Sequence, residues 1–126
     1  MIFDASSLYV VLKKKELERL RDSETLDLAF YEVGNAMLND LRRKIITEES
    51  FTKATEVLNG ISQLIRVEYS SGLDAGNVSE IAKRSALTFC DASYLNLALM
   101  TGEPLATNDG KLKAEAEKLG IKTFSV

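Results

Sequence analysis

Four acidic residues stand in apolar surroundings along this sequence: Asp4, Glu32, Asp91 and Asp109. Asp4 follows an Ile-Phe pair, Glu32 lies in Phe-Tyr-Glu-Val, and Asp91 lies in Phe-Cys-Asp-Ala, while Asp109 lies in Thr-Asn-Asp-Gly. Charged side chains are rarely buried unless they are paired or bind a metal. No obvious basic partner stands beside these acids, so a cation is the natural counter-charge, and a metal held by acids is a route to hydrolysis.

The sequence contains no histidine and a single cysteine, Cys90. The missing histidine excludes Ser-His-Asp chemistry, imidazole general bases and histidine-ligated zinc centres. One cysteine cannot form a disulfide framework within the chain or a multi-cysteine zinc site, and it suits a reducing cytosol. We interpret Cys90 as a small core residue. Any hydrolytic catalyst in this chain must therefore use carboxylates, lysines or hydroxyls.

Each acid also has a plainer interpretation, which stays open from sequence alone. An aspartate at a helix start more often caps the helix than binds a ligand, and this applies to Asp91 and Asp109. Glu32 taken alone reads as a solvated helix residue. For Asp4 a role as a helix cap is the least convincing alternative, because this residue directly follows a strand of apolar residues.

Short apolar runs alternate with stretches of helical period, which predicts strands alternating with helices. The strongest amphipathic stripe follows a predicted N-cap at Thr47 and carries Phe51, Ala54, Leu58, Ile61 and Ile65. The sequence predicts strands at Met1–Phe3, 25–28, 67–69, 105–106 and 122–126. It predicts helices at 6–12, 14–21, 30–43, from 48 along the stripe, after a cap at Asp74, at 91–101 and at 111–119.

This alternation predicts a three-layer α/β/α sandwich with a central, mostly parallel sheet. Asp4 ends the first strand and Asp109 follows the strand at 105–106. Ligands bind at the carboxyl ends of the strands in such sheets. Without a repeat or a linker, residues 1–126 are expected to form a single domain.

Composition sets the remaining bounds. The chain has 126 residues, of which 45% are hydrophobic and 28% charged, as in an ordinary globular protein. A net charge of −3 argues against a dedicated DNA-binding module but not against an enzyme with an acidic metal site. No apolar stretch is long enough to span a membrane, and the protein is expected to be cytoplasmic.

Four motifs in order along the chain resemble those of the PIN-domain ribonucleases, and within them the VapC-type toxins. Met1–Ser6 is similar to the family's first strand with its aspartate and hydroxyl residue, and Tyr31–Ala36 resembles its Glu-Val-x-Asn-Ala helix. Phe89–Ala98 resembles Tyr-Asp-Ala-x-Tyr-x-x-Leu-Ala, and Pro104–Asp109 resembles Leu-Val-Thr-Ala-Asp. The chain departs from the family at Asn108, where a small residue is usual, and its stretch from Leu8 to Leu28 is short.

The resemblance implies a PIN-like fold and a metal-dependent endoribonuclease in which all four acids are catalytic. Mg²⁺ or Mn²⁺ suits oxygen ligands, and Mg²⁺ keeps several waters, so two or three carboxylates suffice to hold it. Our hypothesis is that Asp4 and Asp91 hold the principal ion, that Asp109 helps it or a second ion, and that Glu32 orients a water. The ion would offset charge on the scissile phosphate.

Further residues are assigned supporting parts. Ser6 and Thr107 are expected to fix carboxylates or waters around the ion, and Lys111 is a possible RNA contact. Tyr31 and Tyr94 are interpreted as buried packing residues, with base stacking as the alternative. The resemblance also implies an RNA substrate, a VapB-like antitoxin protein and a homodimer, with no membrane association.

The acids have three rival interpretations. A phosphotransferase with Asp4 as nucleophile would need a second acid two residues later, where Ser6 stands. A receiver domain would need an adjacent acidic pair after the first strand, which is absent. The alternative left open is a catalytically silent PIN-like scaffold that only binds RNA or a partner.

Overall fold

The structure of residues 1–126, a computed structural model, consists of five short strands and six helices joined by three 3₁₀ turns. The strands are β1 (Ile2–Phe3), β2 (Glu24–Leu26), β3 (Arg66–Glu68), β4 (Leu105–Ala106) and β5 (Thr123–Phe124). The helices are α1 (Ala5–Lys14), α2 (Leu28–Arg42), α3 (Glu48–Gly60), α4 (Ala75–Ser85), α5 (Phe89–Thr101) and α6 (Gly110–Lys118). The 3₁₀ turns are Leu17–Leu20, Ile61–Gln63 and Ser70–Gly72.

The strands form one sheet in the order β3-β2-β1-β4-β5, and all four pairings are parallel. Ile2 in the central strand pairs with Glu24 on one side and with Leu105 on the other. The predicted α/β sandwich is confirmed, and the sheet is parallel throughout.

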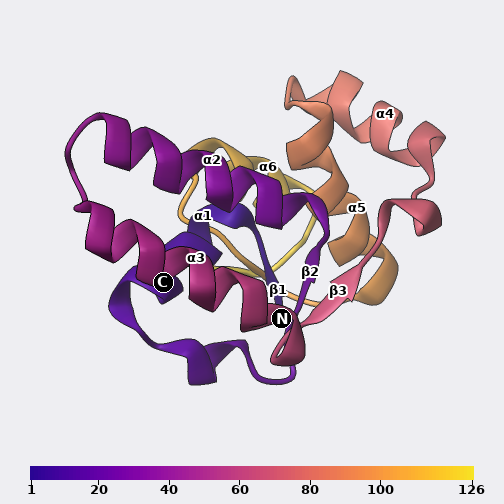
Figure 1. Ribbon diagram of the computed structural model, residues 1–126. Coiled ribbons are helices and arrows are strands. Elements are labelled where there is room, and N and C mark those ends of the chain that lie inside the picture. Colours follow the sequence, from indigo (N-terminus) through magenta and orange to yellow (C-terminus); the bar gives the residue numbers. More distant parts are fainter.

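The order of the strands explains the layers of the sandwich. From β1 to β3 the chain moves toward one edge of the sheet, and from β3 to β5 it crosses to the other edge. Because crossovers between parallel strands are right-handed, the helices of these two halves fall on opposite faces. Figure 1 shows α2 and α3 in front of the sheet and α4 and α5 to the right of β3.

A single cluster of 22 buried apolar residues forms the core. In α5 seven successive residues, from Ala92 to Ala98, are buried, as expected for a helix that is apolar nearly all round. This helix contacts both β1 and β4, the two strands at the centre of the sheet. The helix is therefore packed against the middle of the sheet.

The helix expected at Lys14–Arg21 does not form. Helix α1 instead runs on to Lys14 and ends where Lys15 adopts a left-handed conformation, with φ of 60°. Only a 3₁₀ turn follows, at Leu17–Leu20, and it buries Leu20. Leu17 and Leu20 have the spacing of an α-helix, but in the structure they pack the short connection between α1 and β2 against the core.

Other element boundaries differ by a few residues. The second strand covers Glu24–Leu26, and Leu28 already belongs to α2. Thr47 caps α3 as predicted, accepting a hydrogen bond of 3.1 Å from the Ser50 amide, but α3 ends at Gly60. The last two positions of the amphipathic stripe, Ile61 and Ile65, lie beyond the helix and are buried there. The stripe predicted the buried side of this segment correctly but not its helical length.

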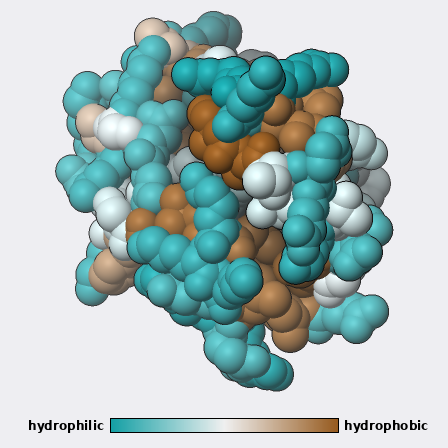
Figure 2. Space-filling view, turned by 60° about the vertical axis from the view of Figure 1, so that its left-hand side comes forward, coloured by the Kyte–Doolittle hydropathy of each residue, from teal (hydrophilic) through white to brown (hydrophobic).

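The surface is mixed in character. Figure 2 brings forward the side that carries the α2–α3 connection and shows mostly hydrophilic side chains with hydrophobic patches between them. Ile45 in this connection has 59% of its side chain exposed. None of the helices is both long and apolar enough to cross a membrane.

Candidate active site at the carboxyl edge of the sheet

Asp4 and Asp109 meet at the point where the strand order reverses. Asp4 follows β1, and the segment Thr107–Asp109 follows the neighbouring strand β4. The Asp4 amide donates to the Ala106 carbonyl over 3.2 Å, so the two strand ends lie side by side. In open parallel sheets this switch point is the preferred place for a ligand.

The Asp4 carboxylate is buried and held by hydrogen bonds at both oxygens. Its side chain is only 4% exposed. Oδ1 accepts from the Ser6 hydroxyl over 2.7 Å and from the Ser7 amide over 2.8 Å. Oδ2 accepts from the Thr107 hydroxyl in a short hydrogen bond. Ser6 and Thr107 thus contact Asp4 at the positions expected for residues that orient a carboxylate.

The expectation that Asp4 has little capping role is wrong. Asp4 is the N-cap of α1, and the Ser7 amide to which its Oδ1 bonds is one of the free amides at the start of that helix. The sequence hid this role because helix α1 begins at Ala5, directly after the strand, with no loop between them. Ser7 was missed for the same reason.

Asp109 is also a helix cap, which is the plainer interpretation that the sequence left open. Its Oδ1 accepts from the amides of Lys111 and Leu112, over 2.9 and 3.1 Å, at the start of α6. Its own amide donates to the Thr107 hydroxyl over 3.0 Å. Both capping bonds go to one carboxylate oxygen, which leaves Oδ2 for other ligands.

Asp91 is not a cap. Thr88, which the sequence analysis missed, caps α5, and its hydroxyl accepts from the Asp91 amide over 3.0 Å. The helix therefore starts two residues earlier than predicted. Burial raises the pKa of the Asp91 carboxyl, and the negative charges of Asp109 and Asp4 raise it further, against a lowering by Thr88 and Lys111.

Glu32 is half-buried on α2 and is not a freely solvated helix residue. Its Oε1 accepts a hydrogen bond of 2.9 Å from the hydroxyl of Tyr94 on α5. Burial raises the pKa of the Glu32 carboxyl, with additional raising by the charges of Asp91 and Asp4, while the Tyr94 bond acts in the opposite direction. Burial also raises the pKa of Tyr94 far above its usual range, so its phenol remains a donor.

The four acids therefore share one electrostatic environment at the carboxyl edge of the sheet. No three acidic or cysteine side chains stand close enough to hold an ion by themselves. Mg²⁺ usually needs only one or two protein carboxylates, because it keeps several of its waters. The donor set consists of carboxylate and hydroxyl oxygens, and neighbouring negative charges raise the pKa values of Glu32 and Asp91, so it fits such an ion.

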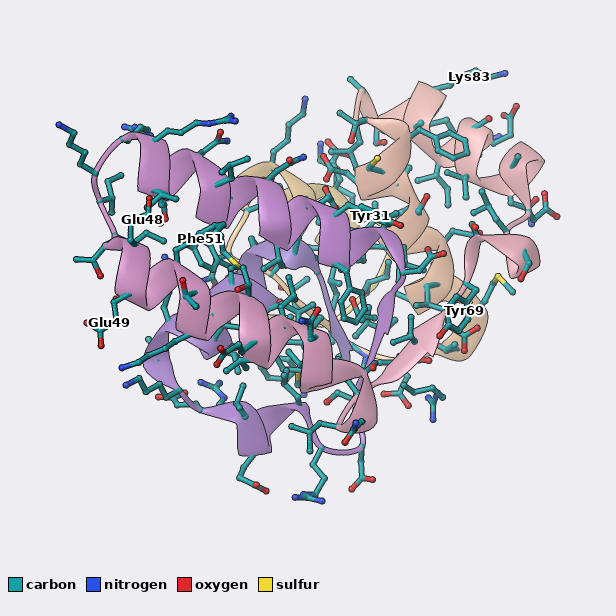
Figure 3. The ribbon with its side chains drawn as sticks, in the orientation of Figure 1. Tyr31, Glu48, Glu49, Phe51, Tyr69 and Lys83 are labelled. Carbon is teal, nitrogen blue, oxygen red and sulfur yellow. The ribbon has the colours of Figure 1, made fainter.

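Three other residues lie near these acids. The Nζ of Lys111 donates to the Ala86 carbonyl over 3.0 Å, which ties α6 to the end of α4. Cys90 is exposed, so its assignment to the core is wrong. Tyr31 is 79% exposed, so its interpretation as buried packing is also wrong, whereas Tyr94 is buried as predicted. Figure 3 shows Tyr31 on α2, beside α5 in that view.

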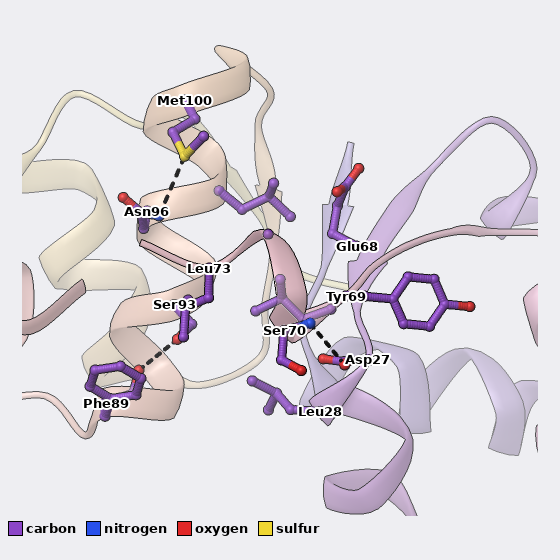
Figure 4. Close-up of a pocket in the computed structure, with 13 residues that line it drawn as sticks. Asp27, Leu28, Glu68, Tyr69, Ser70, Leu73, Phe89, Ser93, Asn96 and Met100 are labelled. Atoms are coloured by element: carbon purple, nitrogen blue, oxygen red, sulfur yellow. Dashed lines mark hydrogen bonds between the residues drawn. The ribbon is translucent and has the colours of Figure 1, made fainter. Parts of the chain in front are cut away.

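A separate cleft lies between α5 and the segment that follows β3 (Figure 4). In this cleft the Asn96 amide donates to the Met100 sulfur over 3.4 Å, and the Ser70 amide donates to Asp27 over 3.0 Å. Its lining contains none of the four acids. The cleft lies at the ends of β2 and β3 and is therefore separate from the four acids.

A wholly parallel α/β/α fold with acids at its switch point places the chain among the α/β proteins that bind ligands at the carboxyl edge of their sheet. Two proteins of Pyrobaculum aerophilum are each 30% identical to this chain. One is named Ribonuclease VapC3, with 89% of this chain and 91% of that protein aligned, and the other Exonuclease VapC9, with 99% and 92% aligned. The chain belongs to the VapC family of PIN-domain proteins.

A solved structure shares the fold of this chain. The crystal structure of PAE2754 from Pyrobaculum aerophilum superposes with a TM-score of 0.79 at 27% identity. The alignment covers 97% of this chain and 81% of that one. No protein-family model matches the chain.

Proposed function

We propose that this protein is a metal-dependent endoribonuclease, the toxin of a type II toxin–antitoxin pair, and that residues 1–126 form its single nuclease domain. The observation that carries the proposal is electrostatic proximity: the charges of Asp91 and Asp4 raise the pKa of Glu32, and those of Asp109 and Asp4 raise the pKa of Asp91. The names of the two relatives, a ribonuclease and an exonuclease, support phosphodiester hydrolysis as the reaction.

Each acid has a role that follows from its surroundings. Asp4 and Asp91 would hold the principal Mg²⁺ or Mn²⁺, and Asp109, through its free oxygen, would help that ion or a second one. The ion supplies charge compensation for the phosphate and activation of a water. Asp4 is fixed in one orientation by Ser6, Ser7 and Thr107. Glu32, whose Oε1 is held by Tyr94, would orient the attacking water and accept its proton.

Membership of the VapC family supports the remaining assignments. The substrate would be RNA, and a VapB-like antitoxin protein would neutralise the enzyme. We also propose a homodimer in the cytoplasm, with Lys111 as a possible RNA contact. The size-exclusion profiles of the protein alone and of its co-expressed complex test the two assembly states.

The first experiment compares the parent with Asp4→Asn on total RNA with Mg²⁺ or Mn²⁺. Asparagine caps a helix as well as aspartate does, so the fold should persist while the anionic ligand is lost. We expect cleavage by the parent, none by the variant, and none by the parent after chelation. The exposed Asp22, in the turn before β2, provides the matched control Asp22→Asn. Undiminished cleavage by Asp4→Asn would remove these acids from catalysis, and an inert parent would favour the scaffold alternative.

A second experiment separates internal from terminal cleavage, because one relative is named an exonuclease. A circular single-stranded RNA has no ends. An endoribonuclease converts it to linear fragments, whereas an exonuclease leaves it intact. An intact circle, with degradation of the same sequence in linear form, would exclude the endonuclease proposal.

A further inference from the structure

Asn108 connects the candidate active site to the segment after β5, and the roles proposed above do not use it. We propose that Asn108 is a positioning residue whose carboxamide fixes the turn from β4 into α6, and so sets where the Asp109 carboxylate stands relative to Asp4. The inference rests on the proposed function for its catalytic consequence.

Both ends of the Asn108 amide bond to the main chain of one residue. Its Nδ2 donates to a main-chain oxygen of Val126 over 2.9 Å, and its Oδ1 accepts from the Val126 amide over 2.8 Å. An asparagine amide presents one donor group and one acceptor in the same plane, and this pairing satisfies both. The side chain is exposed, so burial does not explain the arrangement.

The amide pair extends the ladder between β4 and β5. The main-chain bonds of this ladder run from the Leu105 amide to the Lys122 carbonyl and from the Thr107 amide to the Phe124 carbonyl, each over 2.9 Å. Beyond Thr107 the main chain leaves the sheet to start α6 at Gly110. The Asn108 side chain therefore supplies the next connection to the final segment after its own backbone has turned away.

The same turn is tied to Asp4 from its other side. The Asn108 amide donates to the Ser6 hydroxyl over 2.9 Å, and that hydroxyl donates to Asp4. The next amide, of Asp109, donates to the Thr107 hydroxyl, which also donates to Asp4. The turn is thus held between Asp4 and Val126, and the Asn108 side chain makes the two bonds on the Val126 side.

Asn108→Ala removes those two bonds and leaves the main-chain bond to Ser6 available. The matched control is Thr123→Ala. It removes a 2.8 Å hydrogen bond from the Thr123 hydroxyl to Glu117, which holds β5 to α6 and touches none of the four acids. If Asn108 only anchored the last strand, the two variants would behave alike.

We expect Asn108→Ala to weaken Mn²⁺ binding to the RNA-free protein and to lower kcat for RNA cleavage, each by roughly tenfold, with KM little changed. Thr123→Ala should change neither quantity by more than about twofold. Mn²⁺ affinity is measured by titration and kcat by steady-state cleavage of a defined oligonucleotide. Equal effects of the two variants, or no effect of Asn108→Ala, would overturn the proposal.

A second variant tests the named partner. Val126→Pro removes the amide that donates to Asn108 Oδ1 and leaves the Asn108 side chain in place. Because both substitutions break one connection, the double variant should be little worse than Asn108→Ala alone. Additive losses would mean that Asn108 acts through some other contact.

Hydrogen exchange separates failure of this inference from failure of the proposed function. The Lys111 and Leu112 amides bond to Asp109, so loosening the turn should speed their exchange in Asn108→Ala but not in Thr123→Ala. This result is expected whether or not the protein cleaves RNA. Unchanged exchange at both amides in Asn108→Ala would contradict the positioning role even in an active enzyme.

Discussion

The Tyr94 hydroxyl donates a hydrogen bond of 2.9 Å to Glu32 Oε1 and thereby joins α5 to α2 above the strand ends. Tyr94 is 1% exposed, so its phenol has little access to water as an alternative partner. A buried donor of this kind favours the ionised form of the carboxyl it contacts. The pair therefore gives Glu32 a fixed position and opposes the raising of its pKa by burial and neighbouring acids.

Tyr94→Phe should shift the acidic limb of the kcat/KM profile for RNA cleavage to higher pH. The bond lowers the pKa of Glu32, so its loss lets that pKa rise, and a base with a higher pKa becomes ionised only at higher pH. The free energy of unfolding should fall by about 1 kcal/mol. Tyr31→Phe, which alters an exposed neighbour of Glu32, is the control. An unmoved acidic limb in Tyr94→Phe would show that Glu32 is not the titrating base.

The metal-free protein should be strained electrostatically by its acids, and a divalent ion should relieve this. The pKa values of Glu32 and Asp91 are raised by folding, so their contribution to stability is fully present below the ordinary values of 4.5 and 3.8. It is lost as pH rises through the raised values. Glu32→Gln should therefore gain stability relative to the parent between pH 4.5 and 7 in chelator, as measured by urea unfolding. A constant difference across this range would argue against the raised pKa.

Addition of millimolar Mg²⁺ or Mn²⁺ should raise the Tm of the parent, because an ion that binds only the folded state stabilises it. Asp4→Asn and Asp91→Asn should show a smaller rise than Asp22→Asn. Thermal unfolding in chelator and in each metal measures the effect. Equal shifts in all these variants would indicate non-specific binding and count against the site.

The Thr107 hydroxyl should be needed for both stability and cleavage. It donates to Asp4 and accepts from the Asp109 amide, so Thr107→Val leaves two polar groups without their partner. The expected loss is about 1–3 kcal/mol in the free energy of unfolding, together with a large loss of activity. Thr107→Ser keeps the hydroxyl and should retain most of the activity. If valine and serine behave alike, the hydroxyl does not orient Asp4.

Tyr31 should contribute to RNA binding, since it is exposed on α2, the helix that also carries Glu32. Stacking of a base on an aromatic ring is worth about 1–3 kcal/mol, so Tyr31→Ala should raise the Kd for single-stranded RNA roughly tenfold. Binding is measured in the Asp4→Asn background, which prevents cleavage. Tyr69→Ala removes another exposed tyrosine, one that lines the separate cleft, and should leave the Kd unchanged. Equal affinities of the Tyr31→Ala variant and its parent would exclude stacking at this position.

The sequence by itself determined the alternation of strands and helices and, through it, the parallel sheet. Short apolar runs and helical periodicity are local signals, and they located β1, β4 and the buried helix α5. The order β3-β2-β1-β4-β5 was not predicted, because alternation and the handedness of crossovers are compatible with several strand orders. The placement of Asp4 and Asp109 at the carboxyl ends of strands was predicted, but only the structure showed that these two strands are neighbours.

Tertiary structure alone decided which groups meet these acids. Asp4 bonds to Thr107, which is 103 positions away, and Glu32 bonds to Tyr94, which is 62 positions away. The exposure of Tyr31 and Cys90 depends on how α2 and α5 are rotated about their axes. The residue type alone does not show this rotation, because both residues stand among apolar neighbours in the sequence. Asn108 shows the same limit, since its partner Val126 lies 18 positions later. Local periodicity reports which side of an element is buried, whereas contacts across the sheet depend on the packing of the whole core.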